Sequence, residues 1–429
     1  MNIAVPEGLA VWWGDRMAGT LVVDRHGAMH FAYAQEWLAD LIAPALSHAM
    51  PKRQEPYSNP ICTAVFGGLL PEEAQRTAIA GVLGVSPDNP FRLLKALGGD
   101  VAGALAFLPI DERPPNSIAQ NPGALSETGL AELIDRLPHM PMLAGEGGAR
   151  LCLAGEQSKL PVVLIDNQVA IPQPGQPSTH LIKPEPAMFP GLAANEAFCL
   201  ALARAVGLDV VAGEWRSAKG RPFLLVTRYD RLLREEQVQS LHQEDFAQAL
   251  GVPSNRKYAV EGGPVFRNCF DLLRGATTRP AVEVLKLVDA AIFNVIIGNA
   301  DAHAKNFSLL RRGESGQQVV MAPLYDLVAT VMWKELSPRL SMTFGGARTL
   351  EHLAPESFDR FARSARVSAP FVRRRSRELA ERVINTLKQG LIVPGLYDDR
   401  LVGELAATIE DRANRFAIKA GQPVRVKLR

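Results

Sequence analysis

The sequence has few cysteines, little net charge and no long apolar run. Its 429 residues include four cysteines and no C-x-x-C pair, which argues against a structural zinc site or a disulfide framework and favours a reducing compartment. A net charge of +2 is too small for the whole surface to bind nucleic acid. No apolar run approaches the roughly 20 residues that span a bilayer, and the first residues lack a secretory signal pattern. We therefore expect a cytoplasmic protein without membrane association.

The patterns of two hydrolase classes are also missing. There is no G-x-S-x-G elbow, which argues against a serine hydrolase. His180, His242 and His303 show no H-x-H or H-E-x-x-H spacing. A metal-dependent hydrolase built on Asp301 and His303 stays as an alternative.

The composition is that of a globular protein, with 47% hydrophobic and 21% charged residues, and the chain is long enough for two or three subdomains. Apolar alternation predicts strands over 9–13, 20–23 and 29–33, and helical spacing predicts a helix over 73–83. A linker rich in Pro, Gly and Ser follows at about 111–126.

A second extended region begins at Arg150. We expect Asn195 to cap a helix that ends before Gly207. Strands are predicted over 150–153, 160–165, 169–171, 179–183, 210–215 and 223–229; helices over 244–250, 281–297, 356–364, 371–389 and 401–419; and a β-rich interruption at 307–345. A β-rich half with one helix, followed from about residue 235 by a helical half, resembles the two lobes of a protein kinase, an arrangement that many α+β proteins share.

The segment G-N-A-D-A-H-A-K-N-F-S at 298–308 carries the strongest chemical pattern. It follows a long apolar helix, and Asp301 and Asn306 have the D-x-x-x-x-N spacing of a kinase catalytic loop. In such a loop the aspartate accepts the proton of the attacking hydroxyl and the asparagine holds a metal ion. We expect Asp301 to be the catalytic base.

Asp326, in A-P-L-Y-D at 322–326, stands where a kinase places its second metal-binding side chain. Together with Asn306 and ATP phosphates it suits the oxygen preference of Mg²⁺. The competing interpretation is that Asp301, Asn306 and Asp326 are turn-forming and capping residues.

The segment L-A-G-E-Q-S-K at 153–159 lies between two apolar stretches and is a candidate phosphate-binding loop. With a single glycine it equally fits a plain hairpin. Lys183, about 28 residues further on, is placed to contact the α- and β-phosphates, and Glu196 to pair with it; both also fit a solvated surface. Thr227, Arg228 and Tyr229 lie where a kinase hinge contacts adenine.

The stretch V-R-R-R-S-R at 372–377 lies in a predicted helix with Arg382 and Lys388. It fits a solvated helix face, or a surface for an acidic partner or DNA phosphates.

These motifs together resemble the HipA family, the kinase toxins of bacterial HipBA toxin–antitoxin modules. The resemblance covers nearly the whole chain and implies an α+β, two-lobed, protein-kinase-like fold with an added N-terminal subdomain (1–110), a β-rich N-terminal lobe (140–235) and a helical C-terminal lobe (236–429). It rests on F-A-Y-A-Q-E-W-L, G-L-L-P-E, G-A-L-A-F-L-P, L-A-G-E-Q-S-K, T-H-L-I-K, N-E-A-F-C, V-T-R-Y-D-R, Q-E-D-F-A-Q-A-L-G, K-Y-x-x-x-G-G-P, G-N-x-D-A-H-A-K-N-F-S and P-L-Y-D, which follow in the family's order.

The resemblance implies a serine/threonine-protein kinase that uses ATP and Mg²⁺, with Asp301 and Lys183 in catalysis and Asn306 and Asp326 on the metal. The implied nucleotide-binding residues are Ala154, Gly155, Glu156, Gln157, Ser158, Lys159, Lys183, Thr227, Arg228, Tyr229, His303, Ala304, Lys305, Asn306, Tyr325 and Asp326.

The resemblance also implies partners. Family members phosphorylate translation components, notably aminoacyl-tRNA synthetases, which slows growth and promotes drug tolerance. A HipB-like helix-turn-helix antitoxin binds them, and the complex represses its operon through operator DNA. A catalytically idle, antitoxin-dependent corepressor is the alternative.

One position departs from the family. Well-studied members carry an autophosphorylated serine one residue before L-A-G, and its phosphorylation expels the phosphate loop. This chain has Cys152 there. We expect a small buried strand residue and no such off-switch.

Overall fold

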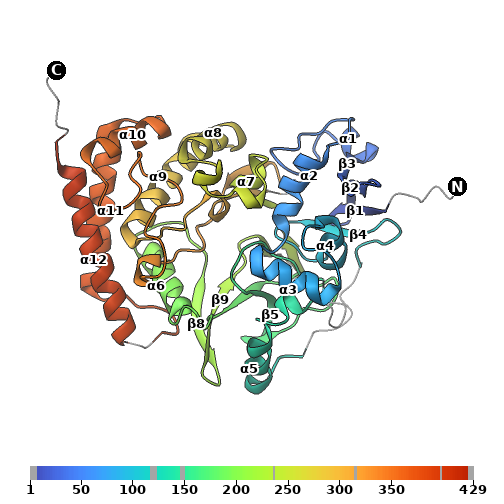
Figure 1. Ribbon diagram of the computed structural model, residues 1–429, viewed down its shortest axis with the longest axis horizontal. Helices are drawn as coiled ribbons and strands as arrows, with labels where there is room; N and C mark the ends of the chain where they lie inside the picture. The colour runs from blue at the N-terminus through green and yellow to red at the C-terminus, as the bar shows by residue number, and fades with distance from the viewer. Residues whose placement is uncertain are drawn as a thin grey trace.

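The computed structural model describes residues 7–115, 123–144, 150–234, 237–313, 316–396 and 399–423. In Figure 1 the N-terminal elements lie on the right, the sheet with β5, β8 and β9 below the centre, and the C-terminal helices on the left. The predicted strand-rich and helix-rich parts therefore occupy different regions of the molecule. Part of the predicted linker, 116–122, lies outside the described residues.

The N-terminal subdomain is built on an antiparallel sheet of order β3-β2-β1-β4. Its elements are β1 (Gly8–Trp13), β2 (Arg16–Val23), β3 (Met29–Tyr33), α1 (Gln35–Ala39), α2 (Asn59–Val65), α3 (Glu73–Leu83), α4 (Pro90–Leu97) and β4 (Leu105–Pro109). Phe31, Phe66 and Phe107 pack edge to face in its core. The three strands and the helix predicted in this region are confirmed.

The β-rich lobe is an antiparallel sheet of order β6-β5-β7-β9-β8. Its elements are α5 (Glu127–Arg136), β5 (Leu160–Ile165), β6 (Gln168–Ala170), β7 (His180–Pro184), α6 (Leu192–Ala205), β8 (Gly213–Ala218) and β9 (Arg221–Thr227). The strand predicted at 150–153 is wrong. That segment makes only a bridge from Leu151 to Asp100, because its backbone bonds to the N-terminal subdomain.

Asn195 does not cap helix α6, so this prediction is also wrong. The helix begins three residues earlier, at Leu192, with Gly191 at its N-cap. Asn195 lies inside the helix, where its amide donates to the Ala329 carbonyl (3.2 Å) and accepts from the Ala329 N–H (2.8 Å). The predicted end is confirmed, since the helix stops at Ala205, just before Gly207.

The C-terminal lobe consists of helices around a central apolar helix. Its elements are α7 (Phe246–Ala249), α8 (Phe266–Ala276), α9 (Pro280–Ile297), α10 (Pro355–Ala365), α11 (Ala369–Gln389) and α12 (Asp399–Gly421). Its strands are β10 (Arg231–Arg234), β11 (Gln237–Ser240), β12 (Gln243–Asp245), β13 (Ser308–Arg312) and β14 (Gln318–Met321). Of the predicted β-rich interruption, 308–312 and 318–321 form strands, whereas 322–345 contains no strand but a short 3-10 turn (Thr330–Met332) and isolated β-bridges at Leu324 and Phe344.

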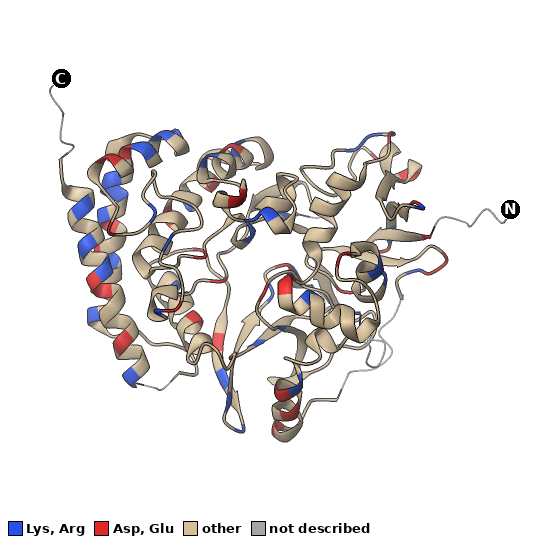
Figure 2. Ribbon diagram, in the orientation of Figure 1, with Lys and Arg blue, Asp and Glu red and all other residues tan. Residues whose placement is uncertain are grey.

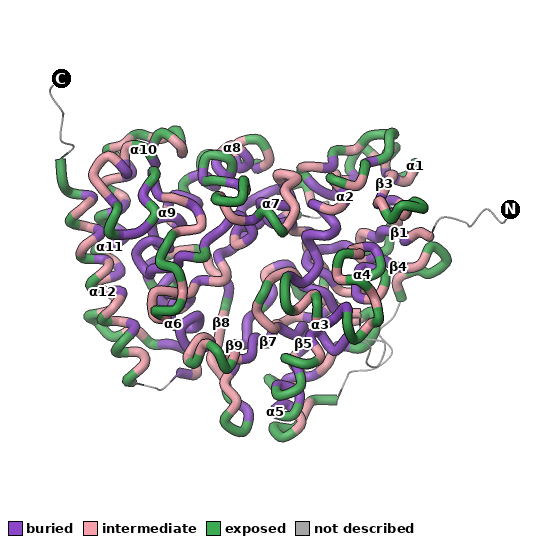
Figure 3. The backbone as a smooth tube through the Cα atoms, viewed as in Figure 1, coloured by how far each residue is buried: buried purple, intermediate pink, exposed green. Residues whose placement is uncertain are grey.

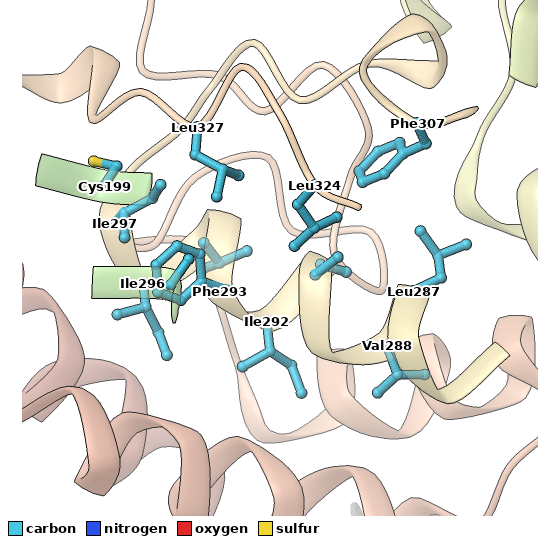
Figure 4. Packing of buried hydrophobic residues seen from close by; sticks show 14 of the residues in the cluster. Cys199, Leu287, Val288, Ile292, Phe293, Ile296, Ile297, Phe307, Leu324 and Leu327 are labelled. Atoms are coloured by element: carbon cyan, nitrogen blue, oxygen red, sulfur yellow. The ribbon is translucent and has the colours of Figure 1, made fainter. Parts of the chain in front are cut away.

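Helix α9 forms the centre of this lobe. Pro280 starts the helix and Gly298 follows its last residue, as expected for these two residue types. Ile292, Phe293 and Ile296 are fully buried. Burial of such a side chain contributes about 1.5–3 kcal/mol to the free energy of unfolding. Figure 4 shows them beside Leu324 and Leu327, and Figure 3 shows buried chain at α9 against the more exposed α11 and α12. This packing fixes where α9 ends, and hence where Asp301 lies.

The arginines of helix α11 mainly hold the lobe together. Arg375 binds Asp289 of α9 through two hydrogen bonds of 2.6 Å, and Arg373 binds Asp359 at 2.9 Å. Arg382 donates to the Val206 carbonyl at 2.6 Å. In Figure 2, basic and acidic residues are interspersed along α11 and α12. The arginines of α11 therefore bind other elements of the lobe and do not form only a solvated basic face.

Candidate active site

The predicted catalytic loop, residues 298–308, is fixed by hydrogen bonds from both of its sides. The Asn306 amide donates to the Asp301 carbonyl oxygen at 3.0 Å, which brings the two predicted residues together. Asn299 accepts from the Asp301 N–H at 3.1 Å and donates to the Asp326 carbonyl at 3.2 Å. Asn299 therefore joins the catalytic loop to the segment of Asp326, a role that the sequence analysis did not assign.

Asp301 has a raised pKa and remains accessible to solvent. Burial among neighbouring protein atoms, together with the nearby Glu156 carboxylate, raises its pKa to about 7, although the residue keeps access to solvent. The Tyr258 hydroxyl donates to its Oδ1 at 3.3 Å. A base whose pKa lies near neutrality accepts and releases a proton readily at physiological pH.

Lys183 joins two carboxylates in the interior. Its ammonium donates to Glu196 Oε1 at 2.7 Å and also to Asp326 Oδ1. Burial alone lowers the pKa of Lys183, but Asp326 and Glu196 raise it above its ordinary value. Burial alone raises the pKa of Asp326, but the ammonium groups of Lys183 and Lys159 hold it at about 2. The expected pairing of Glu196 with Lys183 is confirmed, and its solvated-surface interpretation is wrong because the side chain is 2% exposed.

Asp326 has a left-handed backbone, with φ of 52°. Such a conformation costs a non-glycine residue of order 1 kcal/mol or more and concentrates at functional sites. The Asn299 amide and the Lys183 ammonium hold the residue in this conformation.

The predicted phosphate loop, residues 154–159, is folded against the N-terminal subdomain. The Glu72 N–H donates to the Gly155 carbonyl at 3.1 Å, and Glu156 pairs with Lys257. Lys159 is buried, donates to the Ala154 carbonyl at 2.7 Å, and has no ion pair among the described residues. A side chain at Gly155 would place its Cβ 2.5 Å from the Lys159 Nζ, so the small residue gives that ammonium room.

Two polar atoms of this loop are buried without a hydrogen-bond partner among the described residues. They are Gln157 Nε2 and Ser158 Oγ. Unpaired buried donors are costly and normally have a partner. An anion accepting from these atoms and from Lys159 would satisfy them.

The hinge residues are tied into the protein. The Thr227 N–H donates to the Ala212 carbonyl at 2.9 Å, and the Arg228 N–H donates to the Thr179 carbonyl at 3.0 Å. The buried Arg228 guanidinium binds Asp230 at 2.8 Å. Contact of residues 227–229 with adenine stays a prediction.

The other residues predicted to contact the nucleotide are also buried or bonded inside the protein. Lys305 Nζ lies 2.6 Å from Asp245 Oδ2 and 3.4 Å from Glu72 Oε1. Burial lowers the pKa of His303 to about 4, so this ring is neutral at pH 7. The Tyr325 ring stacks on that of Tyr229 at 5.6 Å, and its hydroxyl donates to the Lys305 carbonyl at 2.8 Å. Ala304 is buried at the start of a 3-10 turn, Ala304–Asn306.

The ion pairs that surround this loop were not predicted from the sequence. Lys257 Nζ contacts Glu72 Oε2 at 2.7 Å as well as Glu156. The motifs K-Y-x-x-x-G-G-P and G-L-L-P-E contain Lys257, Tyr258 and Glu72, so a signal was present. Their pairing was not readable, because Glu72 and Lys257 are 185 positions apart.

Cys152 is fully buried, as expected. Its Sγ lies 3.4 Å from the Leu69 carbonyl oxygen, and burial raises the pKa of the thiol to about 12. It is a neutral packing residue at neutral pH.

Two other classes of feature are absent from the described part of the chain. It holds no cluster of three or more His, Cys, Asp or Glu side chains able to bind a metal ion. None of its helices combines the length and apolar character needed to cross a bilayer.

A cavity of about 1130 Å³ lies away from the predicted site, near Trp13, Trp37 and β11. None of the predicted site residues lines this cavity.

Comparisons with known proteins agree with this description. A model of the HipA N-terminal domain matches residues 9–108, and a model of the HipA-like C-terminal domain matches residues 151–391. The Sinorhizobium fredii protein Y4mE, whose name assigns it provisionally to the kinases, is 50% identical over 94% of this chain and 97% of its own length. The serine/threonine-protein kinase toxin HipA of Shewanella oneidensis is 31% identical over 80% of this chain and 79% of its own length.

A solved structure has a similar fold. HipA of Shewanella oneidensis, in a complex with HipB and its operator DNA, has a TM-score of 0.83 and 25% identity, covering 97% of this chain and 100% of that chain. The sheet, the helical lobe and the added subdomain thus define a two-lobed, protein-kinase-like fold. Because family models match most of its length, the chain belongs to the HipA family of kinase toxins.

Proposed function

We propose that the chain is an ATP-dependent serine/threonine-protein kinase that uses Mg²⁺. The observation that carries the proposal is the Lys183 ammonium held between Glu196 and Asp326, with Asn299 connecting Asp326 to the loop of Asp301. Kinases use such a lysine–glutamate pair and such a metal-binding aspartate to position phosphates.

The residues present fit a nucleotide with its metal. Gln157 Nε2, Ser158 Oγ and the Lys159 ammonium offer donors that suit phosphate oxygens. Asn306 and Asp326 offer oxygen ligands, and phosphate oxygens would complete the set. When bound, Mg²⁺ supplies positive charge that offsets the charge of the phosphates.

Asp301 would accept the proton of a serine or threonine hydroxyl as the hydroxyl oxygen bonds to the γ-phosphorus and ADP departs. Lys183 would orient the phosphates, with Glu196 fixing its position. His303, neutral at pH 7, adds no charge beside Asp301.

The proposal extends to partners. The Shewanella oneidensis relative forms a complex with HipB and operator DNA, which supports a HipB-like antitoxin and operon repression for this chain as well. We place the acceptor among translation components, such as an aminoacyl-tRNA synthetase, on the resemblance of the motifs to the family.

The test is transfer of the γ-phosphate of labelled ATP to proteins of a bacterial lysate. Asp301→Asn should lower transfer by about a hundredfold or more, because the general base is lost. ATP with Mg²⁺ should still raise the melting temperature of this variant, since the phosphate-binding residues remain.

Asp15→Asn, in an exposed turn between β1 and β2, is the matched control and should transfer phosphate like the wild type. Equal transfer by Asp301→Asn and the wild type would refute the catalytic assignment. Absence of both ATP binding and transfer in the wild type would instead favour an idle corepressor.

A further inference from the structure

Residues 253–264 form a compact cover beside the catalytic aspartate. Within this cover, Ser254–Arg256 and Ala259–Glu261 are 3-10 turns, and the Gly263 N–H donates to the Tyr258 carbonyl at 2.9 Å. A Cβ on Gly263 would lie 2.2 Å from the Arg256 carbonyl oxygen, so the turn needs glycine there. The cover therefore has a defined shape.

Two successive residues attach this cover to the active site. Lys257 is buried and binds Glu72 of the N-terminal subdomain and Glu156 of the phosphate loop. Tyr258 turns toward the catalytic loop, where its hydroxyl donates to Asp301 Oδ1 at 3.3 Å. Its ring meets the His303 ring edge to face at 5.5 Å. Lys257 thus anchors the cover while Tyr258 reaches the base.

The contact between Tyr258 and Asp301 has the chemistry expected of a phosphoacceptor. A substrate hydroxyl must donate its hydrogen to the base before it attacks. In this structure the Tyr258 hydroxyl makes that donation. We infer that Tyr258 is an acceptor-site residue whose hydroxyl holds the place of the substrate hydroxyl on Asp301 and is displaced when a protein substrate binds. The inference rests on the proposed kinase function.

This role assigns different functions to the hydroxyl and to the ring of Tyr258, and a substitution can separate them. Tyr258→Phe keeps the ring against His303 and removes only the competing hydroxyl. Water then has freer access to Asp301; its oxygen bonds to the γ-phosphorus, its proton passes to Asp301, and ADP and phosphate leave. Because a long, exposed hydrogen bond such as this one is worth only about 1.6 RT, we expect phosphate release from ATP in the absence of protein substrate to rise roughly fivefold.

The experiment compares wild type, Tyr258→Phe and Val260→Ala as full-length proteins. Val260 lies on the same cover and is 91% exposed, so its variant controls for general effects on the segment. Phosphate release should rise in Tyr258→Phe only. Hydrogen exchange of the peptide over 254–263, measured without ATP, should also be faster in Tyr258→Phe than in the other two proteins.

Other outcomes overturn the inference. Slower phosphate release in Tyr258→Phe would show that the hydroxyl positions Asp301 for catalysis, and an unchanged rate together with unchanged exchange would show that the contact is incidental. If the wild type labels lysate proteins, either result counts against this inference alone. If the wild type neither binds ATP nor transfers phosphate, the proposed function fails and the inference with it.

Discussion

At the scale of single residues, the site depends on one ammonium shared by two carboxylates. Burial, with Asp326 nearby, raises the pKa of Glu196, although Lys183 opposes this shift. The Glu196 and Asp326 carboxylates thus share the Lys183 ammonium, and the contact with Glu196 helps to set the orientation of the lysine side chain. Sequence spacing suggested that Glu196 could reach Lys183, but not that Asp326 would share the same atom.

We predict that Glu196→Gln weakens both stability and catalysis. The amide keeps an acceptor for Lys183 but removes the charge, so Lys183 is left to Asp326 alone. Loss of a charge from a buried pair should lower the free energy of unfolding by about 1–3 kcal/mol. Urea denaturation measures the first effect and lysate phosphorylation the second.

Glu132→Gln, on the exposed face of α5, is the matched control and should change neither quantity. Full stability and full transfer in Glu196→Gln would show that the buried charge is dispensable.

At the scale of elements, helix α6 is tied to the chain that follows Asp326. Asn195 is buried and satisfies both the N–H and the carbonyl of Ala329, which lies three residues beyond Asp326. One helix therefore carries Glu196 toward Lys183 and also fixes the backbone near Asp326.

Replacing Asn195 with Ala should lower the free energy of unfolding by about 1–3 kcal/mol. The variant leaves the Ala329 N–H without a partner, at a cost of about 1–3 kcal/mol, whereas the Ala329 carbonyl still accepts from the Met332 N–H at 3.1 Å. Chemical denaturation of the full chain checks this. Asn414→Ala, on the exposed side of α12, should stay within about 0.5 kcal/mol of the wild type.

At the scale of the whole molecule, buried ionic groups join the N-terminal subdomain to the rest. Glu244 accepts from Ser47 Oγ at 2.5 Å and from the His48 N–H at 2.9 Å. Asp100 lies 2.6 Å from Arg231 and accepts from Ser178 Oγ at 2.7 Å. Glu72 contacts Lys257 and Lys305. Together these contacts bind the N-terminal subdomain to both the β-rich lobe and the helical lobe.

Glu244 makes stability depend on pH. Burial raises its folded-state pKa to about 7, above the ordinary 4.5, so the folded chain binds more protons than the unfolded chain between these pH values. Its contribution to the free energy of unfolding therefore falls as pH rises from about 4.5 to 7, by up to about 3 kcal/mol. Glu244→Gln should remove that decline.

Thermal unfolding of wild type and Glu244→Gln at pH 5, 6, 7 and 8 checks this expectation. The melting temperature of Glu244→Gln relative to wild type should rise across the series, because only the wild type has to charge a buried carboxyl. A difference that stays constant with pH would contradict the shifted pKa.

The structural features that could be predicted from the sequence depend on residues that lie close together in the chain. The approach of Asn306 to Asp301, the strands of the N-terminal subdomain and the end of α6 follow from spacing, alternation and a glycine. The start of α6 was misplaced because Leu192 to Ala194 already favour helix and Gly191 precedes them. The pairs Glu72–Lys257 and Asp100–Arg231 could not be predicted, because they form only when distant segments pack. The nucleotide contacts and the metal site stay predictions.

The position of Asp100 and Glu72 early in the chain has a consequence for synthesis. When the N-terminal subdomain leaves the ribosome, the cations that will neutralise these carboxylates, Arg231 and Lys257, have not yet been made. The nascent subdomain must keep both groups hydrated until the later segments arrive. A chain interrupted before residue 257 therefore lacks the lysine that pairs with both Glu72 and Glu156, and it also lacks Asp301 and Asp326.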